Sequence, residues 1–200
     1  MALATVQLDG RLARSARSRT AVVTALLDLL QEGDLQPTAA RVAERAGVSL
    51  RLVFQHFADL EALYAEAADR QTERLRPALT ALPSGGPFAQ RLQAFVAHRS
   101  RTLETITPIR RAALLRAPFS PVLAARLQDA RAAARAQLAA AFRPELSERP
   151  AAARRELLGA LAVATGFSTW EALRRHQGLP VNQARNIMAR LVRALLKDRT

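Results

Sequence analysis

Apolar residues recur at helical spacing along most of the chain, between short polar stretches that contain glycine or proline. This spacing is typical of amphipathic helices, and the glycines and prolines mark where each helix ends. The helices expected on this basis cover residues 18–31, 38–46, 50–56, 59–79, 88–106, 109–116, 120–141, 147–177 and 181–197. The pattern predicts an all-α protein with a hinge at residues 82–87, which contain two prolines and two glycines.

The tract 38–57 has the pattern of two short helices joined by a tight turn. Thr38 is placed to cap the first helix, and Ser49 is placed to cap the second. Gly47 between them suits the left-handed backbone that such a turn requires. This arrangement predicts a helix-turn-helix, a motif whose second helix reads DNA.

Helical spacing after the second cap directs Leu52 or Val53 inward together with Phe57. The outer face is then formed by Leu50, Arg51, Gln55 and His56. Arginine pairs bidentately with guanine, glutamine pairs with adenine, and an apolar side chain contacts the thymine methyl group. We therefore expect Arg51 and Gln55 to read bases and Leu50 to press on a thymine.

The stretch AGVSLRLVFQHFADLEALYAEAADR resembles the signature of the TetR family of transcriptional regulators, the TetR/AcrR type of helix-turn-helix. The resemblance covers residues 18–76. More weakly, FSTWEALRRHQGLPVNQARNIMARLVRALL is similar to the closing dimerisation helices of actinobacterial-type members. The resemblance implies a homodimer with an N-terminal DNA-binding domain and a C-terminal helical domain for dimerisation and a small-molecule effector.

On this basis we expect a flexible basic arm at 1–17, the DNA-binding domain at 18–60, and the effector and dimerisation domain at 61–200. The run Arg11, Arg14, Arg17 and Arg19, which begins in this arm, contains no acid. The arm either contacts phosphates or the minor groove of DNA, or is a solvated tail. The residues expected to contact DNA are Arg14, Arg17, Thr38, Ala39, Ser49, Leu50, Arg51, Phe54, Gln55 and His56. His56 either packs against its neighbours or touches a phosphate, and the motif favours the phosphate contact.

Three residues depart from the family pattern. Phe54 stands where tyrosine is common, Leu60 where lysine is common, and Leu52 where threonine is common. Each change removes a group that can bond to a phosphate. Two functions therefore remain open: a homodimeric repressor released from a palindromic operator by an effector, and a helical interaction or ligand-binding module with a degraded reading head.

In the C-terminal domain, Arg99 lies within the apolar stripe of helix 88–106 and needs a partner there. It either binds an anionic effector or pairs with an acid such as Glu104 or Glu171. The expected effector pocket is mainly apolar and is lined by Phe95, Arg99, Leu103, Leu115 and Trp170. The expected dimer interface contains Leu161, Phe167, Ile187, Leu191 and Leu195. The alternative is the core of a single chain, and some of these residues must belong to it.

Composition narrows the remaining possibilities. The net charge is +13, but residues 1–57 carry seven arginines and five acids, so most of the excess lies outside the reading head. Cysteine is absent, the three histidines are dispersed, and no glycine-rich phosphate loop or nucleophile motif occurs. We expect no enzyme activity, no metal and no cofactor. The sequence has no long apolar run or signal-peptide core, which predicts a cytoplasmic protein that does not contact the membrane.

Overall fold

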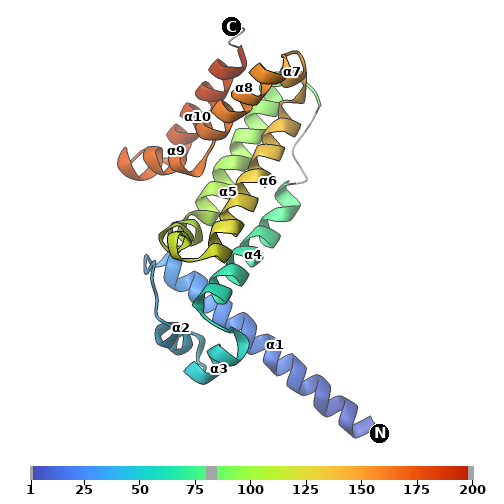
Figure 1. The fold of residues 1–200 in the computed structure, drawn as a ribbon, viewed down its shortest axis with the longest axis vertical. Coiled ribbons are helices and arrows are strands. Elements are labelled where there is room, and N and C mark those ends of the chain that lie inside the picture. The colour runs from blue at the N-terminus through green and yellow to red at the C-terminus, as the bar shows by residue number, and fades with distance from the viewer. Residues whose placement is uncertain (1, 80–84, 198–200) are drawn as a thin grey trace. The chain divides into compact units, whose positions relative to one another are not determined.

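The computed structural model describes residues 2–79 and 85–197, and the side chains of residues 12–74 and 85–197. The described residues form helices and no strand, which confirms the all-α prediction (Figure 1). They divide into a first unit of residues 1–73 and 108–127 and a second unit of residues 74–107 and 128–200. The hinge predicted at 82–87 begins outside the described residues.

The first unit contains the N-terminal helices together with the end of α5 (Phe88–Arg116), the turn η1 (Ala117–Phe119) and the start of α6 (Pro121–Ala141). Its N-terminal helices are α1 (Ala2–Gln31), α2 (Ala39–Ala46), α3 (Leu50–His56) and α4 (Leu60–Leu79). Figure 1 shows α2 and α3 beside α1, and both helices contact it. The shared core consists of buried apolar residues of these helices: Val22, Leu26, Leu29, Leu30, Val42, Val53, Phe57 and Leu63.

Residues 108–127 join the first unit through side chains that α4 presents. The Arg116 guanidinium lies 4.4 Å from the centre of the Tyr64 ring, and the buried Ser120 hydroxyl donates to Glu61 at 2.5 Å. Arg126 also forms an ion pair with Asp69. This grouping differs from the domain boundary expected at residue 60, because contacts between distant segments of the chain determine it.

A flexible arm was expected at 1–17. The structure instead shows this segment as part of a helix that begins at Ala2. α1 begins at Ala2 and continues without a break to Gln31. The segment contains no proline, is rich in alanine, leucine and arginine, and has Gly10 as its one glycine. Such a composition favours the helix over an open chain.

The second unit holds the remainder of α5 and α6 and the C-terminal helices. These are α7 (Arg143–Ser147), α8 (Ala151–Ala164), α9 (Phe167–Glu171), the π-helical turn η2 (Ala172–His176) and α10 (Val181–Lys197). Phe95 and Phe142 meet edge to face with ring centres 5.2 Å apart, in a core that also contains Leu161, Trp170 and Met188. The amphipathic stripes of these helices therefore close over one apolar core.

Two expected helix boundaries are wrong. Segments 88–106 and 109–116 form the single helix α5, with Pro108 inside it, because buried residues on both sides of the proline hold the helix together. The segment 147–177 is instead divided into α8, α9 and η2. Thr165 and Gly166 interrupt it, and a Cβ added at Gly166 would lie 2.8 Å from the Ala162 carbonyl oxygen.

Candidate nucleic-acid interface

The turn between α2 and α3 has the hydrogen bonds that the sequence predicted. The Thr38 hydroxyl accepts the Arg41 N–H at 3.2 Å, and the Ser49 hydroxyl accepts the Leu52 N–H at 3.2 Å. Gly47 has φ +66°, and the Val48 N–H that follows it bonds to the Ala43 carbonyl at 3.0 Å. Both caps and the glycine turn are confirmed, and together they fix where α3 begins.

α3 has an inner and an outer face. Val53, together with Phe57 directly after the helix, is buried, while Leu52 is half-buried. Arg51 and Gln55 are exposed on the outer face, together with Leu50 at 44% and Phe54 at 48%. The structure therefore brings together three of the residues expected to read bases, Leu50, Arg51 and Gln55, with one full helical turn between Arg51 and Gln55.

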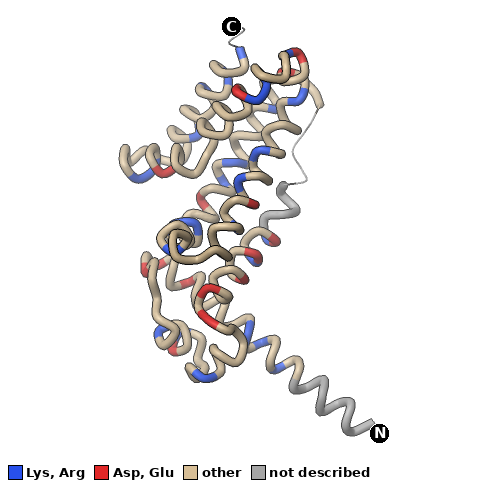
Figure 2. The backbone as a smooth tube through the Cα atoms, viewed as in Figure 1, with Lys and Arg blue, Asp and Glu red and all other residues tan. Residues whose placement is uncertain are grey.

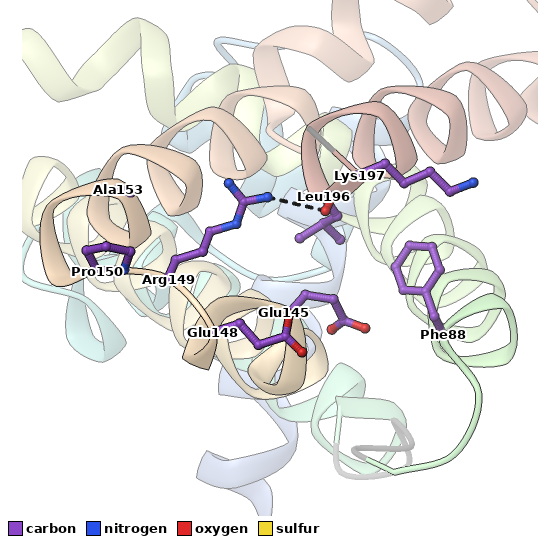
Figure 3. A pocket seen from close by; sticks show the side chains of 8 residues that line it. All are labelled: Phe88, Glu145, Glu148, Arg149, Pro150, Ala153, Leu196 and Lys197. Atoms are coloured by element: carbon purple, nitrogen blue, oxygen red, sulfur yellow. Dashed lines mark hydrogen bonds between the residues drawn. The ribbon is translucent and has the colours of Figure 1, made fainter. Parts of the chain in front are cut away.

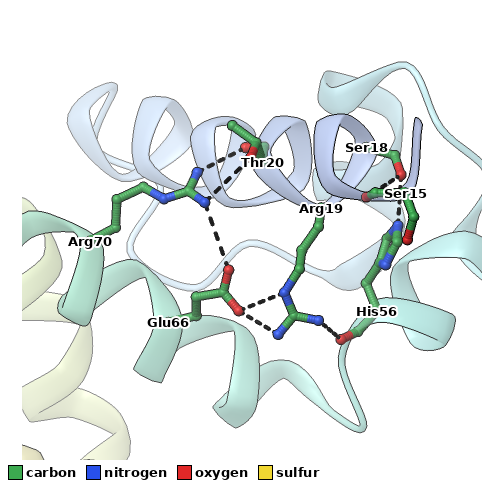
Figure 4. A network of polar contacts seen from close by, with 7 residues as sticks. All are labelled: Ser15, Ser18, Arg19, Thr20, His56, Glu66 and Arg70. Atoms are coloured by element: carbon green, nitrogen blue, oxygen red, sulfur yellow. Dashed lines mark hydrogen bonds and ion pairs between the residues drawn. The ribbon is translucent and has the colours of Figure 1, made fainter. Parts of the chain in front are cut away.

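His56 lies at the end of α3 and is less exposed than the residues of this outer face. It is half-buried, and its Nε2 lies 2.7 Å from the Ser18 hydroxyl of α1 (Figure 4). Its ring also meets the Phe57 ring edge to face, with centroids 6.3 Å apart. The imidazole thus holds the end of α3 against α1. Sequence spacing does not reveal this contact because its partners are far apart in the chain.

Both signs of charge occur among the helices of the first unit (Figure 2). Arg41 pairs with Asp34 at 2.9 Å, and Arg45 pairs with Glu32 at 2.6 Å. The hydrogen bond from Arg45 holds the pKa of Glu32 below its ordinary value. Among the described side chains, Arg51 forms no ion pair, so its guanidinium is available to a ligand.

Four other expected contact residues lie on α1 and at the start of α2. Arg14 and Arg17 are exposed on α1 and are thus carried by a helix. Thr38 is exposed at the start of α2, and Ala39, the first residue of α2, is half-buried. The first N–H groups of a helix have no intrahelical acceptor and favour an anion. A phosphate is therefore compatible with this end of α2.

Three of the residues expected to line an effector pocket are core residues, and a fourth belongs to the other unit. Phe95, Leu103 and Trp170 are at most 1% exposed and belong to the core of the second unit. Leu115 is 47% exposed and belongs to the first unit. Phe95, Leu103 and Trp170 were expected to line a pocket because helical spacing alone does not distinguish a core stripe from a cavity lining.

Arg99 and Trp170 have partners within the second unit. Arg99 Nε donates to the Thr165 carbonyl at 2.9 Å, at the C-terminal end of α8. Trp170 Nε1 donates to Glu104 at 2.8 Å, and the same carboxylate accepts from Arg174 at 3.1 and 3.2 Å. The hydrogen bond with Glu104 raises the pKa of Arg174. The internal partners favour the structural alternative for Arg99 over the effector-binding one.

A hollow of about 530 Å³ lies in the second unit, at residues that the sequence analysis did not single out (Figure 3). Its lining combines charged and apolar side chains: Phe88, Glu145, Glu148, Arg149, Pro150, Ala153, Leu196 and Lys197. Arg149 donates to the Leu196 carbonyl across it at 3.4 Å. Arg149 and Pro150, which precede α8, are both part of this lining.

The residues expected at a dimer interface differ in exposure. Leu161 is fully buried in the core of its own chain, which corrects its assignment. Leu191 on α10 is 40% exposed, while Phe167, Ile187 and Leu195 are half-buried at the edge of the core. Val163 on α8, which the sequence analysis did not select, is 71% exposed. Exposed apolar surface is therefore present on both helices.

Within the described chain, no three His, Asp or Glu side chains are grouped as a metal site would require. None of the described helices combines the length and the apolar character needed to cross a bilayer. These two findings add no candidate chemistry to that of the helix-turn-helix.

No family model matches the sequence, and no curated protein matches it either. Solved structures do match. A transcriptional regulator from Rhodococcus sp. Rha1 has a TM-score of 0.71 and 22% identity, over 90% of this chain and 96% of that one. A TetR-family transcriptional regulator from Streptomyces coelicolor has a TM-score of 0.64 and 21% identity, over 90% and 92%. The chain therefore has the fold of the TetR-family transcriptional regulators.

Proposed function

We propose that this protein belongs to the TetR family and regulates transcription by placing α3 in the major groove of a specific DNA sequence. The observation that carries the proposal is the outer face of α3, where Arg51 and Gln55 are exposed on a helix fixed by the Ser49 cap. Both side chains have the donors and acceptors that base edges recognise. Leu50 and Phe54 add exposed apolar surface for thymine methyl groups and sugars.

Phosphate contacts would hold this helix in register. Thr38, Ala39 and the start of α2 supply backbone N–H groups at one side of the motif, and Ser49 caps the helix that enters the groove. Arg14 and Arg17 on α1 add positive charge. These groups compensate for the phosphate bonds that Phe54 and Leu60 cannot make.

The proposed regulator is a homodimer that joins through α8 and α10. Val163 and Leu191 supply exposed apolar area on these helices, and Phe167, Ile187 and Leu195 supply further partly exposed area. A two-fold dimer carries two copies of α3 and binds a palindromic operator with half-sites about 10 bp apart. Four helices, two from each copy, form the interface.

We further propose that the protein is a repressor and that a small-molecule effector releases it from the operator. The protein has one arrangement that fits DNA and one that does not. Release requires that the effector's affinity is higher for the arrangement that does not fit DNA. An effector with equal affinity for both arrangements leaves the protein on its operator, however tightly it binds.

Selection from a random duplex pool with the full-length protein tests the proposed function. The expected result is an enriched palindromic motif, whose bound complex contains two protein chains. Enrichment without a motif, or no salt-dependent binding to any duplex, contradicts the proposal and favours the helical interaction or ligand-binding module. Operator fragments from the selection then serve to screen small molecules that release the protein.

A further inference from the structure

Arg19 on α1 joins three segments of the first unit (Figure 4). Its Nε and one terminal nitrogen donate to the Glu66 carboxylate of α4 at 2.9 and 2.5 Å. The other terminal nitrogen donates to the His56 carbonyl at 2.6 Å. The guanidinium also lies 4.5 Å from the centre of the Phe57 ring. One side chain of α1 therefore contacts both the end of α3 and α4.

The hydrogen bonds of Arg19 depend on the planar shape of its guanidinium. Arginine presents a planar fork that bonds a carboxylate through two N–H groups, and a lysine ammonium lacks this fork. The His56 carbonyl stands at the C-terminal end of α3, where a positive charge is favourable. The fork and this charge preference together hold α3 by its last turn.

A second link from α4 to α1 lies beside the first one. Arg70 donates to the Thr20 carbonyl at 3.3 Å and to its hydroxyl at 3.4 Å, and it approaches Glu66 at 3.8 Å. Ser18 bonds the His56 imidazole at 2.7 Å. The Glu66 carboxylate therefore lies between Arg19 of α1 and Arg70 of α4.

We infer that Arg19 is a positioning residue, which sets the orientation of α3 against α1 and α4 and does not itself contact DNA. This inference rests on the proposed function, in which α3 is the reading helix. Arg19 is committed to internal partners although its side chain is 44% exposed.

Replacing Glu66 tests the role of Arg19, because the affinity for DNA should rise if Arg19 acts through its charge and fall if Arg19 positions α3. Glu66→Ala removes a negative charge from the unit that is proposed to bind DNA. If Arg19 acts only through its charge, this change strengthens binding to every duplex. If Arg19 is a positioning residue, the change releases it and weakens binding to the selected duplex. Glu44→Ala on α2 is the matched control, because Glu44 is exposed and lies outside these contacts.

The experiment titrates the selected duplex and a scrambled duplex with full-length protein. We expect Arg19→Lys and Glu66→Ala each to lose roughly tenfold in affinity for the selected duplex. Neither should lose affinity for the scrambled duplex, and the double variant should lose little more than either single one. Glu44→Ala should keep or gain affinity for both. A Glu66→Ala protein that binds the selected duplex as tightly as the parent overturns the inference.

Hydrogen exchange without DNA separates this inference from the proposed function. The last turn of α3, where the Phe57 N–H bonds to the Val53 carbonyl at 2.9 Å, should exchange faster in Arg19→Lys and Glu66→Ala than in the parent and in Glu44→Ala. Unchanged exchange overturns the positioning role. Faster exchange in a protein that selects no duplex supports the positioning of α3 and refutes the proposed function alone.

Discussion

Gly47 shows how one residue decides the angle between α2 and α3. Its φ of +66° lies in the left-handed region, and a Cβ added there would meet no atom within 4 Å. The cost of a side chain is therefore conformational and not steric, about 1 to 2 kcal/mol for an alanine. We predict that Gly47→Ala lowers the free energy of unfolding by about that amount, measured by urea denaturation.

Gly47→Asn is the matched variant, because asparagine tolerates the left-handed region better than alanine. It should lose less stability than Gly47→Ala. Equal losses in the two variants would show that space, and not backbone conformation, limits this position.

His98 on α5 links stability to pH. It is 3% exposed, its Nε2 lies 3.2 Å from the Thr102 hydroxyl, and burial together with Arg101 and Arg99 lowers its pKa. Because the folded pKa lies below the ordinary value of 6.5, the unfolded chain binds more protons between the two values. The contribution of His98 to stability is complete above pH 6.5 and is lost as pH falls through its folded pKa.

We predict that the melting temperature of the parent falls more between pH 8 and pH 5 than that of His98→Gln, where these pH values bracket the ordinary pKa of histidine, roughly 6.5. His176→Gln, which changes an exposed histidine, is the control and should follow the parent. Identical profiles for the parent and His98→Gln would remove His98 as the source of the pH dependence.

Local signals at this scale were readable in the sequence, and distant partners were not. The capping roles of Thr38 and Ser49 and the Gly47 turn depend on residues within five positions, so the sequence predicts them correctly. The contact of His56 with Ser18 joins residues 38 positions apart. No spacing rule reaches that far, and the imidazole was therefore assigned to DNA.

At the scale of elements, α8 and α10 carry the proposed dimer interface. A carboxylate placed on an apolar interface has to lose its water without gaining a partner, which opposes association. We predict that Val163→Glu and Leu191→Glu each shift the protein from dimer to monomer, measured by sedimentation equilibrium. Both residues are exposed within one chain, so the fold should tolerate the change.

Val122→Glu is the matched control, because Val122 is 50% exposed and lies on α6, outside the proposed interface. It should keep the dimer. A parent protein that sediments as a monomer, or a Val163→Glu dimer as stable as that of Val122→Glu, would refute the interface on α8 and α10.

The predicted helix boundaries agree with the structure where a capping residue marks them, as at Thr38 and Ser49. They are wrong where packing between distant residues determines the helix. Pro108 was expected to end a helix, yet buried residues such as Leu103 and Ala112 continue α5 through it. Leu161 and Leu191 both belong to apolar helical stripes, but one is fully buried and the other is 40% exposed. Periodicity identifies the apolar stripe without telling which part faces the chain's own core.

At the scale of the whole molecule, the all-helical fold was predictable from helical spacing and the resemblance around 46–70. Solved structures with 21 to 22% identity bear out that fold. The lining of the effector pocket was not predictable in this way, because Phe95, Leu103 and Trp170 belong to the core of the second unit. Large apolar side chains line pockets and cores alike, so sequence alone does not separate them.

The proposed function makes its sharpest prediction at this scale. Arg51→Ala should weaken binding to the selected duplex by about 1 to 3 kcal/mol and leave binding to a scrambled duplex nearly unchanged. Arg131→Ala removes the same charge from an exposed site on α6 in the second unit and should preserve selective binding. The two variants have equal net charge, so a difference between them reports the position of the arginine.

The most direct measurement is therefore the ratio of affinities for the selected and scrambled duplexes, titrated at two salt concentrations for the parent, Arg51→Ala and Arg131→Ala. We predict that raising the salt weakens both complexes, and that only Arg51→Ala collapses the ratio. A parent ratio near one, or equal ratios in the parent and Arg51→Ala, would contradict the claim that α3 reads DNA through Arg51.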